Sequence, residues 1–262
     1  MPTPALHTVI RGEGPRLVLA HGFTQSARLW GGLDDDLTDD HQLVLVDLPG
    51  HGGSSDIHAD LVTGALLLGQ AGGVGDYLGY SMGARFCLHL ALARPGLVSR
   101  LVLVSGTAGI EDAGERAERR RSDEALAERL DPVGGGPPED TVATFVDRWV
   151  ANPMFGEVPE AANGLDERKR SRATGLASSL RQAGTGIQES LWHRLGELDM
   201  PVLVVAGARD AKFTDLGRRL VDGIGGNASM VVIEGAFHAP HLQQPHQVAG
   251  AVRRFLSTTG HD

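Results

Sequence analysis

The stretch Leu78-Gly79-Tyr80-Ser81-Met82-Gly83-Ala84-Arg85 lies between a short strand-like run, residues 74–78, and a helix-like segment, residues 84–93. It contains the pattern Gly-x-Ser-x-Gly, in which a serine occupies a sharp turn between a strand and a helix. The backbone of such a turn is strained and the helix packs close to the strand, so the neighbouring positions need small residues. The two glycines flanking Ser81 meet that need. The sequence therefore predicts that Ser81 is a nucleophile on a strand-to-helix turn.

Further apolar runs rich in Val and Leu occur on both sides of this turn, separated by longer helical or irregular segments. This alternation is typical of a mostly parallel sheet with helices on both faces. We expect strands at residues 6–11, 16–20, 42–47, 74–78, 100–105, 201–207 and 229–235. We expect helices at residues 59–71, 84–93 and 245–256, and another that starts near Thr214.

The alternation stops between residues 109 and 195, where no buried strand is evident. A very polar helix is predicted over residues 115–130, a Gly/Pro-rich connector over 132–138, and two more helices over 141–151 and 166–183. We interpret residues 109–195 as a helical cap inserted into one α/β core made of residues 1–108 and 196–262. A chain of this length can bury most of its surface around a single core.

Composition excludes several classes of protein. The formal net charge is −9 and no basic stripe dominates, which argues against nucleic acid as a partner. The single cysteine, Cys87, allows no intramolecular disulfide and fits a small core residue. No signal peptide or membrane-span-length apolar stretch is visible. We expect a cytoplasmic protein with no membrane association that acts on a small molecule as a monomer or small homo-oligomer.

A serine hydroxyl becomes reactive when a histidine takes its proton and a carboxylate fixes that histidine. With this turn motif the chain order is serine, acid, histidine, with the partners after later strands. Asp210, in Gly207-Ala208-Arg209-Asp210, fits the acid, although it could serve only as a helix cap. Asp215 is a weaker candidate because it lies inside the following helix.

His238 follows the last predicted strand and fits the catalytic base. His241, three residues on, is a rival, and the two histidines could suggest a metal pair, but no further ligands are evident. We therefore expect neither a metal nor a cofactor. His21 and His51 lie in strand-end loops, where we interpret them as a loop-orienting and a turn residue.

Developing negative charge requires two backbone N–H groups directed at it. Met82, which follows the nucleophile, is predicted to supply one. Phe23, in the loop after the second strand, is predicted to supply the other, with little dependence on side-chain identity at either position.

With Ser81, Asp210 and His238 placed, the chain resembles the α/β-hydrolases over nearly its full length. Three stretches resemble the 2-succinyl-6-hydroxy-2,4-cyclohexadiene-1-carboxylate synthase family of menaquinone biosynthesis: residues 79–85, His21-Gly22-Phe23-Thr24, and residues 207–213. The resemblance implies a lyase that eliminates pyruvate from its substrate, with the serine acting as a base. The same triad would equally suit a carboxylesterase, and a binding protein of this fold that has lost turnover is a third reading.

The family holds its multiply charged substrate with arginines and an aromatic residue of the cap. The resemblance places these roles here on Arg85, Arg119, Trp149 and Arg168, with Arg170 second to Arg168. Arg85 is also favoured independently, because it lies one helical turn after Ser81 and arginine binds carboxylates bidentately. For the cap arginines a solvated helix face is the alternative, and Tyr80 could line the site or only pack.

The chain departs from the family at three places. Ala84 replaces a usual glycine, Phe237 stands where glycine is common, and Gln243-Gln244-Pro245 stands where an acidic residue is frequent. A ring at Phe237 could narrow the pocket.

Overall fold

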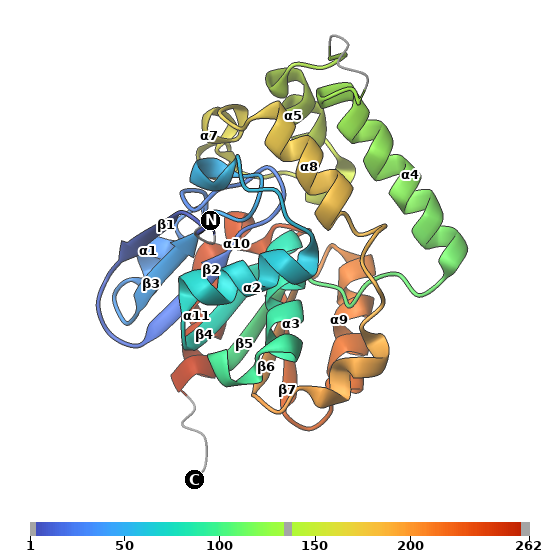
Figure 1. Ribbon diagram of the computed structural model, residues 1–262. Helices are drawn as coiled ribbons and strands as arrows, with labels where there is room; N and C mark the ends of the chain where they lie inside the picture. The colour runs from blue at the N-terminus through green and yellow to red at the C-terminus, as the bar shows by residue number, and fades with distance from the viewer. Residues whose placement is uncertain (1–3, 134–137, 258–262) are drawn as a thin grey trace.

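The computed structural model describes residues 4–133 and 138–257 of the 262-residue chain. Seven strands form one sheet in the order β1-β3-β2-β4-β5-β6-β7 (Figure 1). Among the described residues, β1 runs antiparallel to its neighbour β3, and the other strand pairs are parallel. The strands are β1 Thr8–Arg11, β2 Arg16–Ala20, β3 Gln42–Val46, β4 Gly75–Tyr80, β5 Val98–Val104, β6 Val202–Gly207 and β7 Ala228–Ile233. The predicted α/β arrangement is confirmed.

Most inner strands are buried on both faces over most of their length, which is why they appear as apolar runs in the sequence. Along β2, Val18 and Ala20 join the core under one set of helices, whereas Leu17 and Leu19 join the core on the opposite face. Figure 1 shows α2 and α3 in front of the sheet and α11 behind it. The helices flanking the sheet are α1 Leu33–Leu37, α2 Leu61–Gly72, α3 Met82–Ala93, α9 Ala211–Ile224 and α11 Pro245–Ser257.

β4 is shifted from its predicted range of 74–78, because it begins at Gly75 and continues to Tyr80. Val74 lies outside the strand and is exposed, whereas Asp76 lies inside it and is buried. The Asp76 Oδ1 accepts a hydrogen bond of 3.0 Å from Arg100 Nε on neighbouring β5. This ion pair allows a carboxylate to occupy an inner strand.

Between β5 and β6 the described chain is helical. The helices are α4 Ala113–Leu130, α5 Val142–Val150, α6 Glu160–Asn163, α7 Leu165–Lys169 and α8 Ala173–Ala183. They lie over one end of the sheet (Figure 1) and surround a small core of their own, in which Phe145, Leu176 and Leu180 pack together. The cap limits 109 and 195 stay a prediction, and residues 134–137 of the expected connector lie outside the described residues.

The single helix expected over residues 166–183 is wrong. The chain breaks after α7, and Arg172 is extended, with φ −90° and ψ 136°, before α8 begins. The break lets two segments pack in different directions. Arg168 of α7 reaches Thr24 in the core, whereas Leu176 and Leu180 of α8 pack within the cap.

No helix within the described ranges combines the length and the apolar character needed to span a membrane.

Candidate active site

Ser81 follows β4 directly and is the N-cap of α3, with φ 50° and ψ −102°. Positive φ is uncommon outside glycine and indicates a strained turn. Close packing holds this turn in place, since a Cβ added to Gly83 would lie 1.9 Å from the Ala20 carbonyl oxygen. The Ser81 N–H also donates to the Val104 carbonyl at 2.8 Å. The local backbone is therefore the strand-to-helix turn expected from Gly-x-Ser-x-Gly.

The structure brings together the three residues expected to form a triad. His238 Nε2 lies 3.0 Å from Ser81 Oγ, and His238 Nδ1 lies 2.8 Å from Asp210 Oδ2. Asp210 is also the N-cap of α9, since its Oδ1 accepts the Phe213 N–H. One carboxylate thus both caps a helix and faces the histidine. A proton on Nδ1 leaves Nε2 free to accept the serine proton.

The environment of His238 keeps its ring neutral near pH 7. Burial lowers its pKa below the ordinary value, although the hydrogen bond and charge of Asp210 oppose that shift. The Lys212 cation lowers the pKa further. The ring is 1% exposed and is surrounded by Phe213 at 4.2 Å and Phe155 at 5.9 Å between centroids. A neutral imidazole is the form that can accept a proton from Ser81.

The alternative acid and base lie elsewhere. His241 is buried against Tyr80, with ring centroids 4.1 Å apart, and its Nε2 lies 3.3 Å from Gln25 Nε2. Asp215 pairs with Arg218 on an exposed face of α9. No group of three or more His, Cys, Asp or Glu residues suited to a metal occurs in the described part of the chain.

His21 and His51 hold the loop that presents Phe23. His21 Nδ1 donates to the Gly22 carbonyl at 2.8 Å while its Nε2 accepts the Leu48 N–H at 3.1 Å. His51 Nε2 accepts the Thr24 N–H at 3.3 Å. Both rings are fully buried, and burial lowers the pKa of each, that of His51 to about 3. Neutral imidazoles therefore brace this loop on both sides.

The N–H groups of Phe23 and Met82 have no hydrogen-bond acceptor within residues 4–133 and 138–257. Met82 is the first residue of α3, where backbone N–H groups have no partner inside the helix. The Phe23 side chain contributes more than we expected, because its ring packs edge-on against Trp149 at 4.9 Å. Phe23 therefore links the loop after β2 to the cap.

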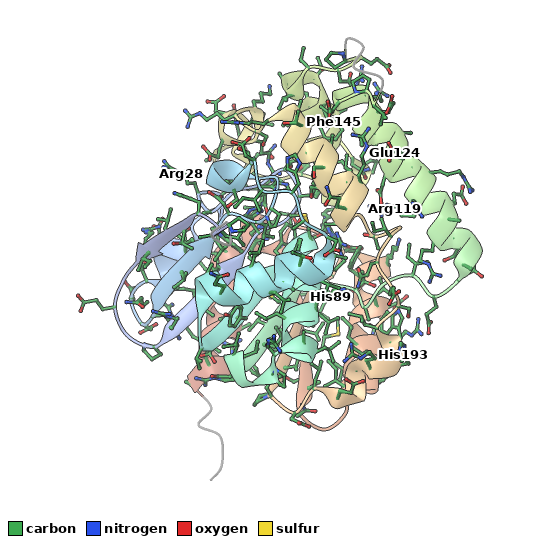
Figure 2. All side chains as sticks on the ribbon, viewed as in Figure 1. Arg28, His89, Arg119, Glu124, Phe145 and His193 are labelled. Atoms are coloured by element: carbon green, nitrogen blue, oxygen red, sulfur yellow. The ribbon has the colours of Figure 1, made fainter. Side chains whose placement is uncertain are left out.

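Ser81 and His238 open into a cavity of about 470 Å³ between core and cap. All of the residues expected at the site line it. Besides the triad, these are Phe23, Met82, Tyr80, Arg85, Arg119, Trp149 and Arg168. Arg170 is exposed and pairs with Glu167, so Arg168 is the arginine of this segment that reaches the cavity. Among the clustered arginines of α4, Arg119, which is labelled in Figure 2, lines the cavity.

Two of these arginines are buried without a carboxylate partner in the described structure. Arg85 Nη1 donates to the Ala183 carbonyl at 2.7 Å, and Arg168 Nη1 donates to Thr24 Oγ1 at 2.6 Å. Burial lowers the pKa of each guanidinium to about 10, so both remain charged at neutral pH. Buried unpaired cations are costly, and a bound anion would relieve that cost.

The segment after α5 contributes residues that the sequence reasoning missed. The His238 N–H donates to the Met154 carbonyl at 3.2 Å, and both Met154 and Phe155 line the cavity. Lys212, Asp123 and Asn152 were also missed. Met154 and Phe155 lie in the stretch quoted for Trp149, so their nearness in sequence was the available signal. The buried Trp149 Nε1 has no hydrogen-bond partner in the described structure.

Phe237 does not narrow the cavity. Its ring packs over Gly156 of the cap, where an added Cβ would lie 2.3 Å from Phe237 Cδ2. The Phe237 N–H donates to Gln243 Oε1, and Gln243 Nε2 donates to the carbonyls of Phe155 and Glu157. Phe237 and Gln243, at two of the positions where the chain departs from the family, therefore join the histidine loop to the cap.

The seven-stranded sheet and a serine turn facing an acid and a histidine are the features of an α/β-hydrolase enzyme. Residues 17–251 match the model of the Alpha/beta hydrolase family, and the chain belongs to that family. The predicted resemblance to the α/β-hydrolases is confirmed.

Individual relatives within this family have named activities. The chain is 31% identical over 250 residues to a 2-succinyl-6-hydroxy-2,4-cyclohexadiene-1-carboxylate synthase of Escherichia coli O1:K1 / APEC, covering 92% of this chain and 94% of that protein. It is 31% identical over 263 residues to a pimeloyl-[acyl-carrier protein] methyl ester esterase of Xanthomonas campestris pv. campestris (strain B100), covering 96% and 99%. The solved structure of MenH from S. aureus matches with a TM-score of 0.84 at 28% identity, covering 95% of this chain and 97% of that one.

Proposed function

We propose that this enzyme is a lyase that eliminates pyruvate from 2-succinyl-5-enolpyruvyl-6-hydroxy-3-cyclohexene-1-carboxylate in menaquinone biosynthesis. The observation that carries the proposal is the pair Arg85 and Arg168, both buried, both without a carboxylate partner among the described residues, and both lining the cavity of Ser81. The proposed substrate carries three carboxylates. The similarity to a synthase of this reaction supports the same assignment.

In the proposed reaction His238 Nε2 takes the Ser81 proton, and Ser81 Oγ takes the ring proton next to the succinyl ketone. The C–H electron pair enters the ring system, the ring C–O bond to the enolpyruvyl group breaks, and that group leaves as the enolate of pyruvate. The enolate takes the proton held on His238 and becomes pyruvate, which restores the neutral imidazole. Negative charge develops on the ketone oxygen, where the N–H groups of Phe23 and Met82 would stabilise it. Asp210 holds the tautomer of His238 that this transfer requires.

The test is serine-dependent pyruvate release from that substrate, with a short-chain nitrophenyl ester assayed in parallel. The wild type is expected to release pyruvate rapidly and to cleave the ester poorly, and Ser81→Ala is expected to abolish both activities. Serine-dependent ester cleavage without pyruvate release would contradict the lyase proposal and favour an esterase. An esterase is the second candidate, because the chain is as similar in sequence to a methyl ester esterase as it is to the synthase, at 31% identity in both cases.

Arg85→Met separates the two candidates more sharply. Loss of a charge-assisted carboxylate bond, typically about 1.5–3 kcal/mol, should lower kcat/KM for the anionic substrate by roughly 10- to 100-fold. Cleavage of a neutral ester should change far less. Arg94→Met is the matched control, because Arg94 lies just after the same helix but is exposed. Equal losses on both substrates would rule out a carboxylate-binding role for Arg85.

A further inference from the structure

Asp123 is a buried carboxylate in a cavity whose other charged groups are mostly cations. It lies on α4, is 2% exposed and lines the cavity beside Arg85 and Arg119. Of the described residues that line the cavity, Asp123 and Asp210 are the acidic ones. Asp210 is engaged by His238, whereas the proposed reaction gives Asp123 no role. A negative charge in this cavity should weaken the binding of an anionic ligand, unless the carboxylate also organises the groups that hold that ligand.

Both oxygens of Asp123 have defined partners. Oδ1 accepts from Arg119 Nε at 2.8 Å, one helical turn earlier on α4. Oδ2 accepts the Gly186 N–H at 3.4 Å, from the loop after α8. That loop passes so close that a Cβ on Gly184 would lie 2.6 Å from Asp123 Oδ2. The carboxylate is therefore fixed between two segments of the cap.

The atom of Arg119 that Asp123 engages is informative. Asp123 binds Nε, and neither Nη group of Arg119 has a hydrogen-bond acceptor in the described structure. The two terminal nitrogens form the fork that binds a carboxylate bidentately. Arg119 is 41% exposed in its side chain, and a free arginine loses considerable rotamer freedom on binding. A bond to Nε restricts the side chain before a ligand arrives and leaves the fork open.

Asp123 also faces Arg85. Its charge raises the pKa of Arg85, opposing burial and the Arg119 cation, which lower it. One carboxylate therefore offsets the repulsion between two guanidinium groups that share the cavity.

We propose that Asp123 is a positioning residue for carboxylate recognition, which holds Arg119 through Nε so that both Nη groups face a ligand carboxylate. This inference deepens the proposed function and rests on it only for the identity of the natural substrate. The ligand class is small polycarboxylates. Simple electrostatics and positioning predict opposite results when the charge of Asp123 is removed.

The experiment is calorimetric titration of the intact protein with propane-1,2,3-tricarboxylate, comparing the wild type with Asp123→Asn. Positioning predicts that Kd rises about tenfold, because the neutral amide holds Arg119 less firmly. Unchanged or tighter binding by Asp123→Asn would overturn the inference, as would a wild type that does not bind the probe. Glu124→Gln is the matched control, because Glu124, labelled in Figure 2, is the next residue, is exposed, and pairs with Arg181.

A double-mutant cycle separates positioning from a purely structural effect. In an Arg119→Met background, Asp123→Asn should cause no further loss of affinity, whereas a structural role would give additive losses. Arg119→Lys keeps the charge but removes the fork, so it should also weaken binding, and it keeps the inference testable if Asp123→Asn folds poorly. A wild type that binds the probe but releases no pyruvate from the proposed substrate would sink the proposed function and leave this inference standing.

Discussion

At the scale of single residues, the site depends on charges set against burial. His238 is neutral because burial outweighs the attraction of Asp210, and the cation of Lys212 acts in the same direction as burial. Lys212 lies in the first turn of α9, where the helix dipole disfavours a cation. Lys212 therefore destabilises the helix electrostatically. The same position places its charge at the cavity wall beside His238.

Lys212→Met should shift the pH profile of kcat/KM. The groups that face His238 are Asp210 and Lys212 from α9, Ser81 from the turn, and neutral rings. Removing the cation raises the pKa of His238, so activity should begin to fall at a higher pH on acidification. The measurement is kcat/KM between pH 4 and 8, with exposed Arg209→Met as the control. An acidic limb that does not move, or moves to lower pH, contradicts this assignment.

At the scale of elements, close packing of β2, β4 and α3 fixes the turn at Ser81. Gly83→Ala would press a methyl group into the Ala20 carbonyl, at 1.9 Å. We expect a loss of unfolding free energy of about 3 kcal/mol or more, together with loss of activity as Ser81 moves. Urea unfolding measures the first and turnover the second. Gly96→Ala is the control, since an added Cβ there meets nothing within 4 Å. Similar unfolding curves for the two variants would mean that the turn tolerates displacement.

The contact between the histidine loop and the cap is also testable as an element. Gln243→Leu removes the hydrogen bonds to Phe237, Phe155 and Glu157. Because the Phe237 N–H and the two cap carbonyls would each lose this partner, we expect the free energy of unfolding to fall by about 1–3 kcal/mol. Hydrogen exchange should accelerate in η3 Pro153–Phe155, and KM should rise more than kcat falls. Gln247→Leu is the control, because the Gln247 side chain is exposed and, among the described residues, donates only to Gln244 Oε1. Unaltered exchange in that segment would show that the cap does not depend on Gln243.

At the scale of the whole molecule, buried neutral histidines make folding sensitive to acid. His21, His51, His238 and His241 are buried, and burial lowers the pKa of each. Below the ordinary pKa of about 6.5 the unfolded chain binds protons that the folded chain does not, so stability falls as pH falls. Each histidine contributes a slope of about 1.4 kcal/mol per pH unit between 6.5 and its folded pKa.

His51→Gln removes one group that binds a proton on unfolding. It should therefore reduce the slope of unfolding free energy against pH by about 1.4 kcal/mol per pH unit between pH 6.5 and 4.5. Urea unfolding across that interval provides the measurement. His246→Gln is the control, because the side chain of His246 is 85% exposed. A His51→Gln profile parallel to that of the wild type would show that His51 is not a source of the acid sensitivity.

Much of the architecture could be predicted from local pattern. The apolar runs predicted all seven strands to within a few residues. The runs are clearest in β2, β3, β5 and β6, because inner strands that are buried on both faces are largely apolar. Gly-x-Ser-x-Gly specified the turn at Ser81 because few other residues fit so close an approach. The break after α7 was not predictable, since no proline or glycine stands at residues 170–172 to end the helix. The turn follows from tertiary contacts, such as those of Arg168 with Thr24 and of Arg172 with Asp56.

Residue spacing and chain order were enough to predict the sheet, the serine turn, Arg85, and candidates for the acid and the histidine. The cap arginines Arg119 and Arg168 were expected only from the family resemblance. The packing of segments that are distant in the chain decides that His238 rather than His241 faces Ser81, that Arg168 rather than Arg170 enters the cavity, and that Asp123 of α4 lines this cavity. Ser81 and His238, which are 157 positions apart in the chain, meet at the site, and no local pattern encodes such a contact.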